Sequence, residues 1–154
     1  MNRGVFLMPI CLCYFIFIIT GFSCSNESRV KNIYTCPCDS GLVAKIQYKG
    51  LYLGAKKYDS KLVEIEGYYI AQFEQSALFR SNNRNNKSAI WIDFNTGDSL
   101  KDSKSGAYLF SSSEETNKIN GKRIKIRGVF DFNLHGHLDE YFGEIKRICY
   151  LETL

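Results

Sequence analysis

Two histidines and two carboxylates stand close together in the stretch NLHGHLDEY of residues 133–141. Histidine is the side chain that titrates nearest neutral pH, and a neighbouring carboxylate favours its charged form and fixes its orientation. We expect His137 to meet Glu74, which lies at the turn after an earlier predicted strand. The pair predicts either a hydrogen bond that stabilises the fold or part of a ligand-binding groove. The candidate ligand-binding residues are Glu74, Arg80, Trp91, His135, His137 and Tyr141.

Metal binding is a second chemistry that these histidines could support. His135 and His137 are two residues apart, so in an extended chain their side chains point the same way. The thiols of Cys36 and Cys38 could add soft ligands of the kind that zinc or copper accepts. Because these groups come from distant segments and one thiol is expected in a disulfide, we predict no metal site and no cofactor.

Catalytic motifs are absent from the sequence. It contains no G-x-S-x-G nucleophile turn, no H-E-x-x-H motif and no glycine-rich phosphate loop. The paired carboxylates Glu114 and Glu115 stand at a predicted helix start, where they interact favourably with the helix dipole. We therefore predict that the protein is not an enzyme.

Five stretches of alternating apolar and polar residues predict the β-strands that must position these side chains. A polar interval, 95–120, contains SSSEETNKI, whose Ser and Glu spacing is typical of a helix N-terminus. In the last strand Ile145 and Ile148 are out of period by one, which indicates a bulge. The predicted strands span residues 61–74, 76–79, 89–94, 121–132 and 142–151.

The order of these elements predicts the fold class. Five strands with a helix between the third and fourth are typical of the OB-fold, a small Greek-key barrel. We predict a mainly β domain over residues 39–154 with an OB-like five-stranded barrel and one short helical insert. A small β-sandwich or an open meander is the alternative. Residues 39–60 predict only a loosely determined lead-in with one strand or helical turn.

The first strand separates apolar and charged faces. Val63, Tyr69 and Phe73 share the face predicted to be internal, and Gly67 in mid-strand indicates a sharp bend or a close approach of another backbone. Glu64 and Glu66 lie on the outer face. In an OB barrel the first and fourth strands are neighbours, so these carboxylates are expected beside Arg123, Lys125 and Arg127. The stripe predicts a self-neutralising surface, with anion or nucleic-acid binding as the alternative.

The N-terminal residues 1–23 predict a secretory signal peptide. Arg3 precedes an uncharged apolar run, 5–19, which is shorter than the roughly 20 residues that span a bilayer. A membrane anchor made by this run is the alternative. Small residues precede Cys24, and TGFSCS resembles a bacterial lipobox, although Gly21 stands where Leu is usual. The resemblance implies lipid attachment at Cys24 and a tether over 24–38, with simple exposure of Cys24 after ordinary cleavage as the alternative.

Lipid attachment sets the expected location. Ser25 after the cysteine resembles the signal of outer-membrane lipoproteins that face the periplasm, and a soluble periplasmic or secreted protein is the alternative. The chain carries a formal net charge of +4, of which Arg3 leaves with the signal peptide. So small a positive charge predicts no nucleic-acid partner. The expected partners are the membrane, through the anchor, and an envelope protein or a small ligand.

Three cysteines remain for an oxidising compartment, in which disulfides form readily. A bridge between Cys36 and Cys38 is strained, because residues two apart in an extended chain cannot reach disulfide geometry. We therefore predict that Cys149 pairs with Cys36 or Cys38, which leaves one thiol free.

The stretches GYYIAQFEQSALF, AIWIDF, NGKRIKIRGVFDF, GHL and FGEI, within residues 67–148, resemble a group of uncharacterised secreted or lipid-anchored bacterial proteins with OB-like domains. The resemblance implies the fold and carries no activity. We predict an envelope lipoprotein with a binding or interaction module of unknown ligand. A structural accessory subunit, whose barrel edge pairs with a partner protein, is the alternative.

Overall fold

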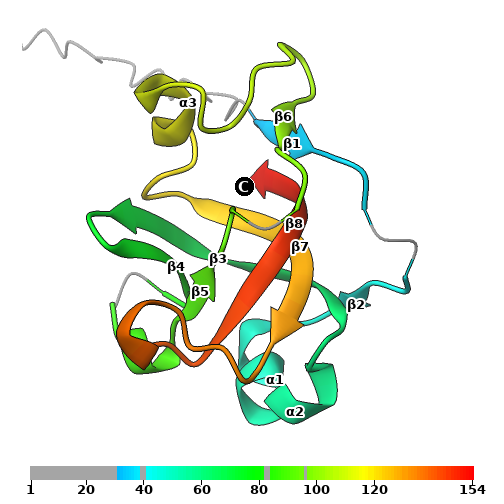
Figure 1. Cartoon of the computed structure of the whole chain (residues 1–154), viewed down its shortest axis with the longest axis vertical. Coiled ribbons are helices and arrows are strands. Elements are labelled where there is room, and N and C mark those ends of the chain that lie inside the picture. The colour runs from blue at the N-terminus through cyan, green and yellow to red at the C-terminus, as the bar shows by residue number, and fades with distance from the viewer. Residues whose placement is uncertain (1–30, 39–40, 82–83, 96) are drawn as a thin grey trace, which may run out of the picture.

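The computed structural model describes residues 31–38, 41–81, 84–95 and 97–154 (Figure 1). Five strands close into a barrel in the order β3-β4-β5-β8-β7, and β7 pairs back onto β3. All neighbours are antiparallel except β5 and β8, which are parallel. This closed mixed barrel confirms the predicted mainly β, OB-like fold. The strands are β3 (Leu62–Gln72), β4 (Gln75–Phe79), β5 (Ile90–Ile92), β7 (Arg123–Asp131) and β8 (Gly143–Thr153).

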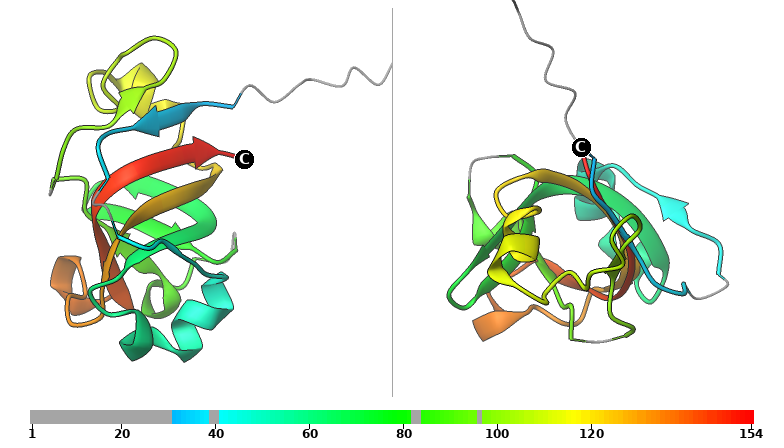
Figure 2. Two further views of the ribbon diagram at one scale, coloured as in Figure 1. Left: turned by 90° about the vertical axis from the view of Figure 1, so that its right-hand side faces the viewer. Right: turned by 90° about the horizontal axis from the view of Figure 1, so that it is seen from above.

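Shorter elements cover the two ends of the barrel (Figures 1 and 2). Helix α3 (Ser113–Asn117) is the predicted insert between β5 and β7, and the Ser112 hydroxyl accepts the Glu115 N–H at its start, at 3.2 Å. Strand β6 (Lys101–Asp102) lies at the same end. Helices α1 (Tyr48–Leu53) and α2 (Ala55–Tyr58) lie at the other end.

The N-terminal part is more ordered than the sequence predicts. Strand β1 (Ile33–Thr35) falls in the predicted tether, yet it pairs with β8. Strand β2 (Ala44–Lys45) pairs in parallel with the start of β3. The predicted loose lead-in of residues 39–60 therefore contains β2 and two helices, which sequence alternation alone does not reveal.

Alternation places the core as predicted, with one correction. The inward residues Val63, Ile65 and Tyr69 of β3 are all at most 1% exposed. The prediction that Phe73 continues this internal face is wrong. Strand β3 ends at Gln72, and the Phe73 side chain is 91% exposed in the turn. The strand period no longer applies once the chain turns.

Two backbone features shape the barrel. A Cβ on Gly67 would lie 2.6 Å from Leu78 Cγ and 2.7 Å from the Phe79 carbonyl oxygen, so the missing side chain permits the close approach of β4. The register of β7 and β8 shifts between Arg127 and Val129, and Arg147 has a φ of +49°. The predicted bulge in the last strand is confirmed.

A disulfide joins Cys38 to Cys149, with 5.1 Å between the Cα atoms. This pairing selects one of the two predicted partners and ties the segment before the barrel to its last strand. Cys36 keeps a free thiol, which lies 3.3 Å from the Ile148 carbonyl oxygen, and its N–H donates to the Cys149 carbonyl at 3.1 Å. Burial, and secondarily the charge of Asp98, raise the pKa of the Cys36 thiol. The thiol is therefore held in its protonated, less nucleophilic form.

Candidate functional site

The segment between β7 and β8, residues 132–142, lies on the outer face of β4 and β5 (Figure 1). Gly136, with a φ of +62°, sits directly against the Trp91 ring: a Cβ there would lie 2.7 Å from Trp91 Cδ2. The Phe142 N–H donates to the Ala89 carbonyl at 2.8 Å, just before β5. OB-folds bind ligands on this face and at its flanking loops. Here the chain's own loop covers it.

The predicted meeting of His137 and Glu74 is present in the structure. His137 Nε2 lies 3.5 Å from Glu74 Oε2, and both side chains are partly exposed. The pair joins the loop after β7 to the turn between β3 and β4. The Trp91 ring stacks on the His137 ring, with 6.4 Å between centroids. The imidazole thus has an aromatic face on one side and a carboxylate at its nitrogen.

Tyr141 and His135 hold the loop rather than line a groove. The Tyr141 side chain is only 5% exposed and packs in a cluster with Ile70, Ala77 and Phe79. His135 Nδ1 lies 3.0 Å from the Tyr141 carbonyl oxygen, a contact that fixes the two ends of the loop. Both residues therefore act in the packing of the site.

Further contacts attach the loop to its surroundings. The Asn86 amide donates to Glu140 at 3.2 Å and accepts from Gln75 at 3.3 Å. Leu138 and Asp139 have φ values of +56° and +55°, in the left-handed region that non-glycine residues rarely occupy. Such conformations persist where surrounding contacts over-determine the backbone, and they are frequent at functional sites.

Arg80 does not belong to this site. It follows β4, whereas Glu74 precedes β4, so the two residues lie at opposite ends of the strand. Arg80 lines a separate depression with Lys45 and Lys49. The candidate set from the sequence therefore divides into a cluster around His137 and a distant arginine.

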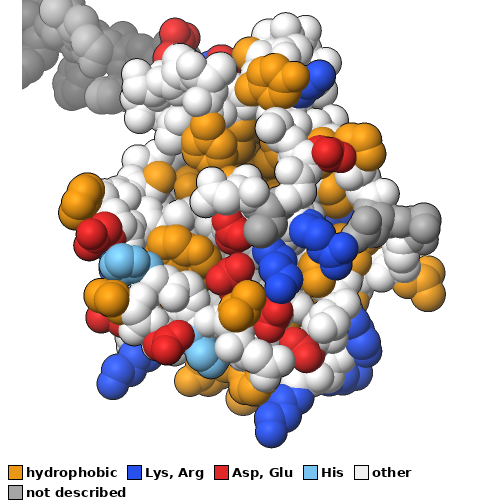
Figure 3. All heavy atoms as spheres, in the orientation of Figure 1, with side chains coloured by type: hydrophobic (Ala, Val, Ile, Leu, Met, Phe, Trp, Pro, Cys, Tyr) orange, Lys and Arg blue, Asp and Glu red, His pale blue; other side chains and the backbone are white. Residues whose placement is uncertain are grey.

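Two residues that sequence reasoning missed stand beside the His137–Glu74 pair. Phe73 is 91% exposed and Leu138 is 75% exposed, each adjacent in the chain to one member of the pair. We call Phe73 and Leu138 the apolar tip. The signal in the sequence was a large apolar residue within a polar loop, HGHLDE, but it does not reveal exposure. Figure 3 shows hydrophobic and acidic side chains gathered around a histidine on this face.

A separate pocket of about 260 Å³ lies between the segment after β5 and the segment before α3. Its apolar walls include Phe94, Tyr108 and Phe110. Small-molecule sites usually measure about 300–1,000 Å³, so this pocket is smaller than an ordinary ligand site. Within the described ranges no group of three metal-ligating side chains is close enough to hold a metal ion.

The outer stripe of charge has the predicted register. Glu64 lies opposite Arg127 and Glu66 opposite Lys125. Arg127 Nη2 lies 2.6 Å from Glu64 Oε2, and Arg123 Nη2 lies 2.9 Å from Glu66 Oε2. These pairs neutralise much of the strand face.

The predicted signal peptide and Cys24 lie outside the residues that the structure describes. Among the residues that it does describe, no helix is long and apolar enough to cross a membrane. No protein-family model, curated protein or solved structure matches the chain. The resemblance to lipid-anchored OB-like proteins is thus supported only as far as the five-stranded barrel.

Proposed function

We propose that this protein is a bacterial envelope lipoprotein whose barrel docks a partner protein through the apolar tip. The observation that carries the proposal is the display of Phe73 and Leu138, 91% and 75% exposed, from two loops that the His137–Glu74 pair joins. Export and lipid attachment at Cys24 come from the sequence alone.

A protein partner fits this surface better than a small ligand. Residues 132–142 already cover the face on which OB-folds bind ligands, with Gly136 against Trp91 and Tyr141 buried. What is left for contact includes two exposed apolar side chains, Phe73 and Leu138, each next in the chain to a member of the His137–Glu74 pair. Protein interfaces combine such large apolar anchors with a polar surround.

The tip is held in a fixed arrangement before it binds. The contacts of Glu140 with Asn86 and of His135 with the Tyr141 carbonyl restrain the loop on the barrel. A pre-ordered loop loses little conformational freedom on association, so more of the contact energy appears as affinity.

An accessory subunit that pairs through a barrel edge has less support. Each of the five barrel strands pairs with a neighbour on both sides. Where the strands are paired, the barrel therefore has no free edge to which a partner strand could add. Docking through the tip needs no strand edge.

The test places a photo-crosslinking amino acid at Phe73 or at Leu138 in cells. Leu53 in α1, 74% exposed, is the matched control position. We expect one discrete adduct of the same mass from both tip positions and none from the control. Absence of an adduct at the tip, or the same adduct from Leu53, would refute tip docking.

The lipoprotein part is tested separately by mass spectrometry of the mature chain. The expected species begins at Cys24 and carries acyl mass, and Cys24→Ser should release the protein from the membrane fraction. A chain that retains Met1 would overturn the envelope location.

A further inference from the structure

Three adjoining depressions of the surface all have Tyr68 of β3 in their lining. The largest, about 940 Å³, extends along the outer face of β3 towards β2 and α1. The second lies beside the first described residues and the end of β8, and the third beside Gly121. The surface around Tyr68 is therefore one continuous hollowed region, which we call the Tyr68 face.

The Tyr68 face is strongly basic. Among the described residues that line it, the acidic ones are Glu64 and Glu66. Residues 31–154 as a whole carry 18 basic and 15 acidic side chains, a net charge of +3. The Tyr68 face has a net charge of +6, so the rest of this region has a net charge of −3. Its basic side chains are Lys45, Lys49, Arg80, Arg84, Lys118, Lys122, Arg123 and Lys125.

Some of these bases are paired and others are not. Arg123 and Lys125 both contact Glu66, and Lys118 contacts Glu115. Arg80, Arg84 and Lys122 are exposed and have no ion pair with any residue in the described part of the chain. Unpaired cations on one hollowed face attract anions more strongly than cations that are already neutralised.

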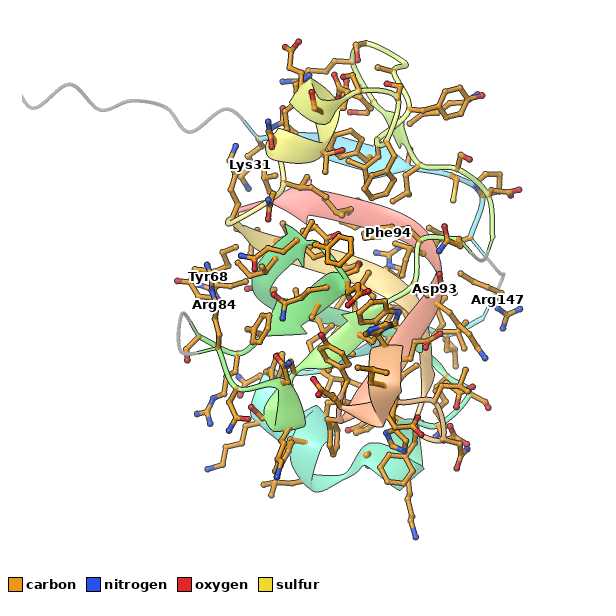
Figure 4. All side chains as sticks on the ribbon, turned by 60° about the vertical axis from the view of Figure 1, so that its left-hand side comes forward. Lys31, Tyr68, Arg84, Asp93, Phe94 and Arg147 are labelled. Carbon is orange, nitrogen blue, oxygen red and sulfur yellow. A yellow bond between two sulfur atoms is a disulfide. The ribbon has the colours of Figure 1, made fainter. Side chains whose placement is uncertain are left out.

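The place where the N-terminal segment joins the barrel indicates what binds the Tyr68 face. Asn32 lines one of the three depressions, and Lys31, Tyr68 and Arg84 lie on the same side of the molecule (Figure 4). Asn32 lies eight residue steps after Cys24 in the sequence. Eight fully extended residues span at most about 29 Å. An acyl anchor at Cys24 would keep this face close to the membrane surface.

We propose that the Tyr68 face binds the phosphate groups of anionic phospholipids in the membrane that holds the anchor. This inference rests on the proposed lipid anchor and adds a second, electrostatic contact to it. Each Lys or Arg near an anionic bilayer strengthens partitioning by roughly fivefold, and the attraction acts only within about a Debye length. The bases would orient the barrel, which an anchor on a short tether cannot do alone.

A nucleic acid is the other polyanion that a basic face could bind. Single-stranded nucleic acids are held by several stacking aromatics along a basic groove. Tyr68 is the aromatic residue that the three depressions share, and the other aromatic residues among their described lining are Tyr48 and Phe79. Tyr48 and Phe79 are buried, at 8% and 2% exposure, so they offer no stacking surface.

The test uses the mature chain with Cys24→Ser, so that no acyl group contributes. Binding to phosphatidylcholine vesicles is measured with and without phosphatidylglycerol, by co-sedimentation at low and high salt. The test variant is Arg80→Ala/Arg84→Ala/Lys122→Ala. The control, Lys56→Ala/Lys87→Ala/Lys104→Ala, loses the same charge from exposed positions that do not line the three depressions.

We expect binding only to vesicles that contain phosphatidylglycerol, weakened by salt and reduced on the order of 100-fold in the test variant. The control should lose less than about fivefold. Equal losses in the two variants, or tighter binding to a single-stranded oligonucleotide than to the anionic vesicles, would overturn the proposal. Crosslinking at Phe73 does not depend on these bases. A negative vesicle-binding result therefore does not affect the proposal of docking at the tip, and a negative crosslinking result does not affect the proposal of lipid binding.

Discussion

Removal of the Cys38–Cys149 disulfide should cost several kcal/mol of stability without changing the folded contacts. The bridge closes a loop with a sequence separation of 111 residues. In the chain-entropy model, a loop of that length removes about 16 cal/mol/K from the unfolded state, or about 4.8 kcal/mol at 25 °C. Hydrogen bonds between β1 and β8, and the bond from the Cys36 N–H just after β1 to the Cys149 carbonyl, still join the two segments after the bridge is lost. The loss should therefore come mainly from a freer unfolded chain.

The assay compares Cys36→Ser with Cys36→Ser/Cys38→Ser by urea unfolding. Cys36→Ser removes the free thiol, which would otherwise offer Cys149 a second partner directly opposite it, and a serine hydroxyl can still donate to the Ile148 carbonyl. We expect the single variant to stay within about 1 kcal/mol of the parent. The double variant should lose about 4–5 kcal/mol, and reduction of the single variant should reproduce that loss. A loss below about 2 kcal/mol would show that the bridge does not constrain the unfolded chain as argued.

Two further predictions concern the packing of Gly136 on Trp91 and the ion pairs of Glu152. Gly136→Ala should cost about 3 kcal/mol and shift the fluorescence of Trp91, the one tryptophan of the chain, because the new methyl group meets its ring. Gly106→Ala, at a φ of +72° with open space around it, should cost only about 1 kcal/mol, and equal costs would refute the packing argument. Glu152 accepts from Lys31, Tyr150 and Lys125, which lowers its pKa to about 2. Because the folded pKa is depressed, its contribution is present above about pH 4.5 and is lost as the pH falls towards 2. Urea unfolding across this range should show parent and Glu152→Gln differing by on the order of 1–2 kcal/mol at pH 6 and converging near pH 2, and a constant difference would contradict the assignment.

Most of the barrel was predictable because its strands obey local rules. Alternation in β3 and β7 places Ile65 and Ile126 inside and pairs Glu64 with Arg127 outside. Those patterns depend only on the period of a strand, which the sequence displays directly. The prediction was wrong at Phe73, where the strand ends and the period with it.

The candidate site was predictable only in part, because loops follow tertiary contacts rather than periodicity. The His137–Glu74 approach follows from OB topology, which brings the two loops together. Nothing local in the sequence indicates that Gly136 lies on Trp91 or that Tyr141 is buried. Residues 132–142 cover the outer face of β4 and β5 because of that packing.

The Tyr68 face was hidden for a different reason. Its bases come from separate segments, among them Lys49 of α1, Arg80 after β4 and Lys122 before β7. Within any one of these segments the charges look like an ordinary solvated surface. From the sequence only the β7 stripe stands out as a charged surface, and ion pairs partly neutralise that stripe.

The two proposed surfaces constrain each other through β3, the strand that they share. Tyr68 and the turn residue Phe73 are five residues apart, and β3 extends to Gln72, so the tip lies within about 17 Å of the centre of the basic face. A barrel that rests on lipid phosphates through the Tyr68 face would hold its tip within that distance of the bilayer. A partner that docks there must also reach the membrane surface, which favours a membrane-bound or lipid-anchored protein over a freely diffusing one. The acyl anchor, independently of these bases, would raise the local concentration of tip and partner, so that an interface anchored by two apolar side chains could suffice.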